Sequence, residues 1–174
     1  SGKCEIPWQE NDEYEPLNVY GYSKAKGDKR VANVGGKWLI FRPIWVYDYD
    51  GKNFLTTFLK LANTQDEICI VNDQYGAPTY APHVAAVSLK GLEYAQSLPE
   101  FPSGIYHVCH KGVTTWYGFA RTILEKVRAK GMRLQVKTIK PISTQDYAAP
   151  AKRPGNSRMN TEKAKKILRI ELSE

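Results

Sequence analysis

Apolar residues along the chain gather in short runs that are separated by polar turns. The run over residues 37–47 (Lys-Trp-Leu-Ile-Phe-Arg-Pro-Ile-Trp-Val-Tyr) is continuous enough for a buried parallel strand. Residues 67–72 and 104–109 form shorter runs of the same kind, and residues 134–139 alternate like a strand. Pro43 is expected at the carboxyl end of the first strand, because proline cannot donate a ladder hydrogen bond.

Helical periodicity fills most of the chain between these strands. Apolar residues recur at helical spacing over residues 53–64, at Phe54, Leu55, Phe58, Leu59 and Ala62. Further helices are expected over residues 19–34, 81–97, 116–130 and 162–169, with Asn18, Asn53, Thr114 or Thr115, and Asn160 or Thr161 as their N-caps. The mixture of buried strands and helices predicts an α/β fold with parallel strands.

Two turn-rich segments are candidates for ligand binding. Residues 73–82 contain Gly76, Pro78 and Pro82, and residues 140–156 contain three prolines. Ligands of open α/β sheets bind beyond the carboxyl ends of the strands, so Trp45 is placed where a cofactor ring or a sugar could rest. Trp45 is equally well explained as a core aromatic, and the 73–82 loop, with Gln74 and Thr79, as a structural corner. Arg153 on the later loop could clamp a diphosphate or form a surface ion pair.

Composition narrows the class of protein. The 174 residues are enough for one domain with a core, and 42% hydrophobic and 25% charged residues are ordinary for a globular protein. No apolar run approaches the roughly 18 residues of a membrane span, so a cytoplasmic protein without a membrane partner is expected. Cys4, Cys69 and Cys109 have neither disulfide nor metal spacing, which predicts no metal site and buried thiols at Cys69 and Cys109. The net charge of +7 suits an anionic ligand, but no motif combines basic and aromatic residues for nucleic acid.

The start of the first helix carries a tyrosine and a lysine four residues apart. Tyr20 and Lys24 are expected on one helix face, where the cation should lower the tyrosine pKa from its reference of about 10 and make the phenol a proton donor. In a chain with 11 Tyr, about one such pair is expected by chance. Tyr22 and Lys26 form a second pair, roughly 200° around the helix from the first.

Several further segments, taken in order, resemble the dTDP-4-dehydrorhamnose reductase family of the extended short-chain dehydrogenases/reductases. They are Asn18-Val19-Tyr20-Gly21-Tyr22-Ser23-Lys24, Phe41-Arg42-Pro43-Ile44-Trp45-Val46-Tyr47, Asn53-Phe54-Leu55-Thr56-Thr57, Asp73-Gln74-Tyr75-Gly76-Ala77-Pro78-Thr79-Tyr80-Ala81, Gly104-Ile105-Tyr106-His107-Val108, Trp116-Tyr117-Gly118-Phe119-Ala120 and Ala151-Lys152-Arg153-Pro154-Gly155-Asn156-Ser157. The Asp-Gln-x-Gly-x-Pro-Thr block is far more specific than the Tyr/Lys pair, and the resemblance spans nearly the whole chain.

The resemblance implies the carboxyl-terminal part of a Rossmann-like enzyme. Residues 1–47 would supply the active-site helix and the following strand. Residues 48–174 would mix later sheet elements (about 81–130) with a small substrate lobe (about 48–80 and 134–174).

The same resemblance implies an NADPH-dependent reductase, with NADH possible, acting on a 4-keto-6-deoxy nucleotide sugar. Tyr20 and Lys24 would be catalytic and would contact the cofactor together with Arg42 and Pro43. Residues on the substrate side would be Trp45, Asn53, Gln74, Thr79 and Arg153.

A dinucleotide-binding enzyme also needs a glycine-rich turn after its first strand, and we find none, since Gly35-Gly36 lies between a helix and a strand. We therefore expect this polypeptide alone neither to bind NADPH tightly nor to turn over. We also expect a free sheet edge that favours homodimers or other self-association. The alternative is a non-catalytic binding or regulatory protein on the same scaffold, as in the regulatory subunit of methionine adenosyltransferase.

Overall fold

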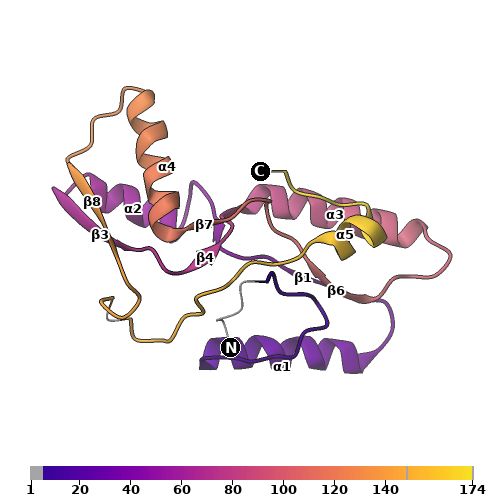
Figure 1. Ribbon diagram of the computed structural model, residues 1–174. Coiled ribbons are helices and arrows are strands. Elements are labelled where there is room, and N and C mark those ends of the chain that lie inside the picture. Colours follow the sequence, from indigo (N-terminus) through magenta and orange to yellow (C-terminus); the bar gives the residue numbers. More distant parts are fainter. Residues whose placement is uncertain (1–5, 148, 174) are drawn as a thin grey trace.

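The computed structural model describes residues 6–147 and 149–173. It is an α/β structure with five helices and eight short strands among these residues (Figure 1). The helices are α1 (Val19–Val34), α2 (Phe54–Ala62), α3 (Ala81–Ser97), α4 (Trp116–Ala129) and α5 (Glu162–Leu168). The strands are β1 (Leu39–Arg42), β2 (Val46–Tyr47), β3 (Glu67–Val71), β4 (Tyr75–Gly76), β5 (Thr79–Tyr80), β6 (Gly104–His107), β7 (Thr114–Thr115) and β8 (Thr138–Ile142).

The strands pair two by two, and three of the four pairs are parallel. Strand β1 pairs with β6, β2 with β5 and β3 with β8 in parallel, whereas β4 and β7 run antiparallel. Within the described residues, neither β1 nor β6 has a strand on its other edge. The parallel α/β arrangement confirms the predicted fold class.

Two large hydrophobic cores, beside a small third cluster, organise the described residues. One joins α2, β3, α4 and β8 through residues such as Phe58, Ile68 and Leu124. The other joins β1, β6, α3 and α5 through residues such as Tyr106 and Leu168. Figure 1 shows α1 on the opposite side of β1 and β6 from α3 and α5, and α1 buries no residue in the described structure.

This packing assigns two helices differently from the expected grouping of segments. Helix α4, which fell within the 81–130 group of sheet elements, packs against α2 and the β3–β8 pair. Helix α5, which fell within the substrate lobe, packs against α3 and β6. The reason is that an amphipathic helix packs its apolar face against the hydrophobic core that it meets in space, whichever segments precede and follow it in sequence.

Three local expectations differ from the structure. The apolar run 37–47 breaks at residues 43–45, where Trp45 has a positive φ of 45° and redirects the chain. The strand expected over residues 134–139 lies at Thr138–Ile142, because its bounds are set by pairing with β3. Cys69 is exposed, since it alternates on β3 with the buried Ile68 and Ile70, whereas Cys109 is buried as expected. Cys4 lies outside the described residues.

Candidate functional site

The helix that carries the Tyr/Lys pair begins at a well-formed N-cap. The Asn18 side-chain Oδ1 accepts a hydrogen bond from the backbone N–H of Gly21 at 2.8 Å. One turn further, Lys24 Nζ lies 5.5 Å from the centre of the Tyr20 ring, so the expected pair is formed. The second pair is formed as well, with Lys26 Nζ 4.9 Å from the Tyr22 ring centre.

The surroundings distinguish the two tyrosines. Tyr20 is 71% exposed and lines two adjoining cavities, whereas Tyr22 lines neither. The Tyr20 hydroxyl has no hydrogen-bond partner within the part of the chain that the structure describes. Of the two tyrosines, Tyr20 is the one that borders a space large enough for a ligand.

The larger cavity, of about 820 Å³, brings together residues from widely separated parts of the sequence. Four of the predicted site residues line it: Tyr20, Trp45, Gln74 and Arg153. The loop Pro150–Pro154 forms another part of its wall, and its Lys152 and Arg153 side chains are exposed. The cavity thus combines an aromatic wall, a phenol and two cations, which suits an anionic ligand that carries a ring.

The aromatic wall includes a residue that the sequence did not single out. Trp116, at the first position of α4, stacks on Trp45 with ring centres 3.8 Å apart and planes 15° apart. Its indole Nε1 donates to Gln74 Oε1 at 3.2 Å. The nearby N-cap Thr115 marked this position as a helix start, but no sequence signal placed the indole in the cavity.

Both the oxygen and the nitrogen of the Gln74 side-chain amide are hydrogen-bonded. It is 5% exposed, accepts from Trp116 and donates through Nε2 to Thr144 Oγ1 at 3.0 Å. Thr144 in turn donates its backbone N–H to Asp73. Burial acts to raise the Asp73 pKa, but the side-chain and backbone hydrogen bonds from Thr144 outweigh it and hold that pKa below its usual value.

Two residues expected on the substrate side have other contacts in the structure. Asn53 caps α2 in a capping box with Thr56, and its Nδ2 donates to the Asp48 and Asp50 carbonyls. Thr79 is fully buried, with its hydroxyl donating to the Ala77 carbonyl and its N–H donating to the Trp45 carbonyl at 3.1 Å. Neither lines the cavity, so the geometry supports a role in shaping its wall.

Arg42, expected to contact the cofactor, is part of an ionic cluster that fastens α1 to the sheet. Its guanidinium forms an ion pair with Asp28 of α1 at 2.7 Å and donates to the Tyr14 hydroxyl. Burial raises the Tyr14 pKa against the opposing charge of Arg42. Pro43 follows at the end of β1 and is exposed.

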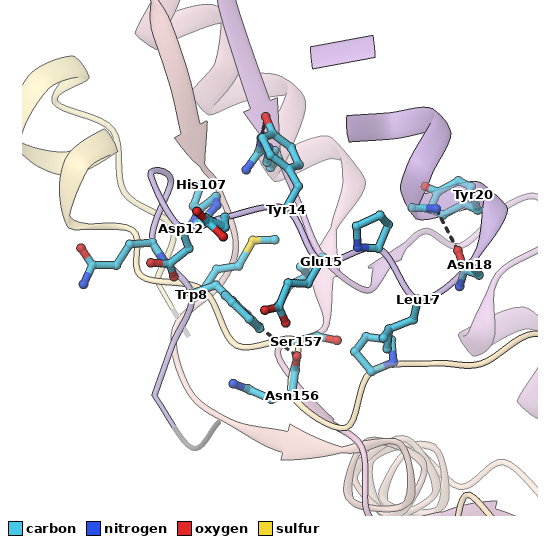
Figure 2. Close-up of a pocket in the computed structure, with 18 residues that line it drawn as sticks. Trp8, Asp12, Tyr14, Glu15, Leu17, Asn18, Tyr20, His107, Asn156 and Ser157 are labelled. Atoms are coloured by element: carbon cyan, nitrogen blue, oxygen red, sulfur yellow. Dashed lines mark hydrogen bonds between the residues drawn. The ribbon is translucent and has the colours of Figure 1, made fainter. Parts of the chain in front are cut away.

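The second cavity, of about 360 Å³, shares Leu17, Asn18 and Tyr20 with the first (Figure 2). It is bordered by Tyr14, Glu15, Tyr20 and the buried His107. The backbone N–H of His107 donates to Glu10 Oε1 at 3.0 Å. Burial lowers the His107 pKa, although the Glu10 carboxylate opposes the shift. Asn18 lines both cavities and so lies at their boundary.

The described residues contain neither a cluster of metal-ligating side chains nor a membrane-spanning helix. They contain no group of three or more His, Cys, Asp or Glu side chains placed to hold a metal ion. Nor does any helix within residues 6–147 and 149–173 have the length and apolarity to span a membrane.

Comparison with known proteins identifies the relationships of this chain. The family model described as RmlD substrate binding domain matches residues 1–174. The dTDP-4-dehydrorhamnose reductase of Salmonella typhimurium is 43% identical over 162 residues, covering 93% of this chain and 54% of the relative. The enzyme of that name from Burkholderia thailandensis is 43% identical over 176 residues, covering 98% of this chain and 59% of its own length.

Solved structures agree with the sequence comparison. The dTDP-4-dehydrorhamnose reductase of Bacillus anthracis, crystallised with NADP, superposes with a TM-score of 0.87 at 28% identity, over 99% of this chain and 57% of the other. UDP-glucose 4-epimerase of Thermotoga maritima, at 17% identity and a TM-score of 0.72, shares the fold. The chain spans about half the length of these curated relatives, and its full-length match to the family model shows that it belongs to the RmlD substrate binding domain family.

Proposed function

We propose that this chain carries the substrate side and the proton donor of a reductase that converts a dTDP-linked 4-keto-6-deoxy sugar into its rhamnose product with NADPH. The observation that carries the proposal is the convergence of Tyr20, Trp45, Gln74 and Arg153 on one cavity. Family membership and the names of the relatives support the same activity. The NADP in the Bacillus anthracis structure supports the choice of cofactor.

The residues beside the larger cavity suit such a cofactor and substrate. The cofactor, when bound, supplies the hydride for carbonyl reduction. Tyr20 then gives its hydroxyl proton to the sugar carbonyl oxygen, because its phenol is exposed at the cavity. Lys24 lies beside the Tyr20 ring and lines neither cavity; it would hold a ribose hydroxyl of the bound cofactor, and its charge would stabilise the phenolate that remains.

The other predicted residues receive distinct roles. Arg153, with Lys152, balances the charge of the sugar diphosphate. Trp45 would provide an apolar wall for the sugar, and the exposed Pro43 after β1 would contact the cofactor. Because Asp28 already engages Arg42, we assign Arg42 to holding α1 in place rather than to direct cofactor contact.

Titration calorimetry with dTDP-rhamnose tests the substrate site on the 174-residue chain itself. We expect saturable binding that is weakened by Arg153→Gln, and no heat from dTDP-rhamnose would refute the substrate assignment. NADPH oxidation with dTDP-4-dehydrorhamnose tests the reaction on the complete reading frame that encodes this chain. We expect the 174 residues alone to show neither tight NADPH binding nor turnover, and measurable reduction by them would contradict that expectation.

The same pair of measurements separates the alternative function. A complete protein that binds the nucleotide sugar without oxidising NADPH would be a binding or regulatory protein on this scaffold.

The open edge of β1 supports a further expectation, that the chain self-associates. A strictly monomeric species in light scattering at high protein concentration would contradict it.

A further inference from the structure

The side chain of Asn18 bonds in two directions at once. Its Oδ1 caps α1 by accepting from the Gly21 N–H, and its Nδ2 donates to the backbone carbonyl of Lys152 at 2.8 Å. Lys152 is 134 residues further along the chain. One amide therefore joins the start of the helix that carries Tyr20 to the loop that carries Lys152 and Arg153.

The loop, residues 144–157, is anchored to β4 and to the segment before it by hydrogen bonds of described residues near its two ends. At the near end, Thr144 is fixed by the Asp73 carboxylate. At the far end, the Gly155 carbonyl accepts from Tyr75 N–H, and Ser157 N–H donates to the Tyr75 carbonyl, both at 2.8 Å.

Between these ends the segment Pro150–Pro154 lines the larger cavity. Its two prolines have no N–H to donate, so the segment has few hydrogen bonds of its own to make. The Asn18 contact falls in the middle of this span, where it restricts the position of the two cations most directly.

We propose that Asn18 is a positioning residue that fastens the Pro150–Pro154 loop to α1, so that the loop cations face the cavity beside Tyr20. The proposal rests on the proposed function for the identity of the ligand, the diphosphate of a nucleotide sugar. Asn18 acts through the Lys152 backbone and the helix start. Its loss should therefore weaken ligand binding, raising KM while leaving kcat nearly unchanged.

Two substitutions separate the tether from the helix cap. Asn18→Asp keeps an oxygen for the Gly21 N–H, and aspartate caps helices as well as asparagine does, but it has no donor for the Lys152 carbonyl. Asn18→Ser likewise caps, and its short hydroxyl does not extend as far as the amide. Asn18→Ala removes both functions and serves as the control for loss of the cap.

Trypsin reports on the tether without any ligand. The bond after Lys152 belongs to the carbonyl that Asn18 holds, so cleavage requires the tether to open. The next bond, Arg153–Pro154, is resistant because proline follows. Peptide mass spectrometry of the 174-residue chain then gives the cleavage rate after Lys152 relative to that after the exposed Lys52, in a turn far from the loop in sequence.

Losing one hydrogen bond should raise the relative cleavage rate after Lys152 about three- to tenfold in Asn18→Asp and Asn18→Ser. In Asn18→Ser, which adds no charge beside the anionic ligand, the dissociation constant for dTDP-rhamnose should rise by a similar factor, with helicity unchanged. In Asn18→Ala the cleavage rate should rise as well, with some loss of helicity.

Unchanged cleavage after Lys152 in both capping variants would overturn the tether. Faster cleavage with an unchanged dissociation constant would overturn its role in binding. If the unsubstituted chain fails to bind dTDP-rhamnose at all, the proposed function fails, whereas the cleavage rates still decide whether Asn18 holds the loop.

Discussion

Trp45 and Trp116 lie face to face, with ring centres 3.8 Å apart, although 71 residues separate them in sequence. The backbone of Trp45 has a positive φ of 45°, which a bulky residue rarely adopts. The stacked partner and the hydrogen bond from Thr79 N–H to the Trp45 carbonyl hold this conformation. The wall of the cavity thus depends on contacts made well outside residues 43–47.

Removing the stacked partner should therefore loosen the wall. Trp116→Ala should destabilise the fold by up to about 3 kcal/mol, less than for a fully buried tryptophan because Trp116 is half-buried. Trp116→Phe keeps a ring against Trp45 but leaves the buried Gln74 oxygen without its donor, which should cost about 1–2 kcal/mol. Denaturant unfolding measures both, and equal stability of Trp116→Ala and the unsubstituted chain would contradict the prediction.

Gly76 is needed for the close approach of the Trp45 ring. A Cβ at this position would lie 2.6 Å from Trp45 Cε2, so Gly76→Ala should cost about 1–3 kcal/mol and displace the indole. Gly27→Ala is the matched control, because no atom lies within 4 Å of its added Cβ and it is inside α1. The control should stabilise the chain by about 0.5–1 kcal/mol. The idea fails if thermal melts rank the two variants in the opposite order.

The two Tyr/Lys pairs of α1 allow a matched test of catalysis. In the complete reading frame, Tyr20→Phe should lower kcat about 10²- to 10⁴-fold, the usual worth of a general acid. Tyr22→Phe should leave kcat within about twofold, because Tyr22 lines neither cavity. Steady-state NADPH oxidation checks both, and similar losses in the two variants would remove the reason for preferring Tyr20.

Stability should fall in mild acid because of His107. Burial holds its pKa below the ordinary value of about 6.5, so below that pH the unfolded chain binds a proton that the folded chain does not. The free energy of unfolding is therefore highest above about pH 6.5. It decreases as the pH falls toward the lower pKa that His107 has in the folded chain. Denaturant midpoints at pH 7.5 and 5.5 measure this loss. His107→Asn, which retains a polar side chain, should show a smaller change between the two values, and an identical change would exclude His107 as its source.

The two described cysteines should differ sharply in reactivity. Burial raises the Cys109 pKa to about 11, so at pH 8 only about one thiol in a thousand is ionised there, and its side chain is inaccessible. Cys69 is exposed on β3. Brief maleimide labelling followed by peptide mapping should modify Cys69 and leave Cys109 intact, and comparable labelling of both would show that the core around Cys109 opens readily.

Local signals in the sequence predicted the helices well. Caps and periodicity gave α1 and α3 with the bounds that the structure shows, and Asn18, Asn53 and Thr115 cap as expected. The short strands β2, β4 and β5 were not expected as separate elements, because each exists only through pairing with a distant partner such as β7. Strand β8 was misplaced for the same reason, and its Pro141 argued against a strand there.

The candidate site was predictable to a similar degree. The family resemblance named four residues that the fold gathers at one cavity, but local pattern could not show that Thr79 is buried or that Asp28 engages Arg42. Trp116 and the Asn18–Lys152 contact were missed because both depend on which segments meet in space. Neither contact produces a hydrophobic periodicity that could be recognised in the sequence.

The division into two cores has a mechanical consequence. A third, smaller cluster of Ile44, Ala77 and Cys109, with Trp45 and Met159 packed against it, accompanies the two larger cores. Trp45 also lines the larger cavity and stacks on Trp116, which packs against the first of those cores. We therefore expect a ligand pressed against that indole to act on the small cluster and on the first core together.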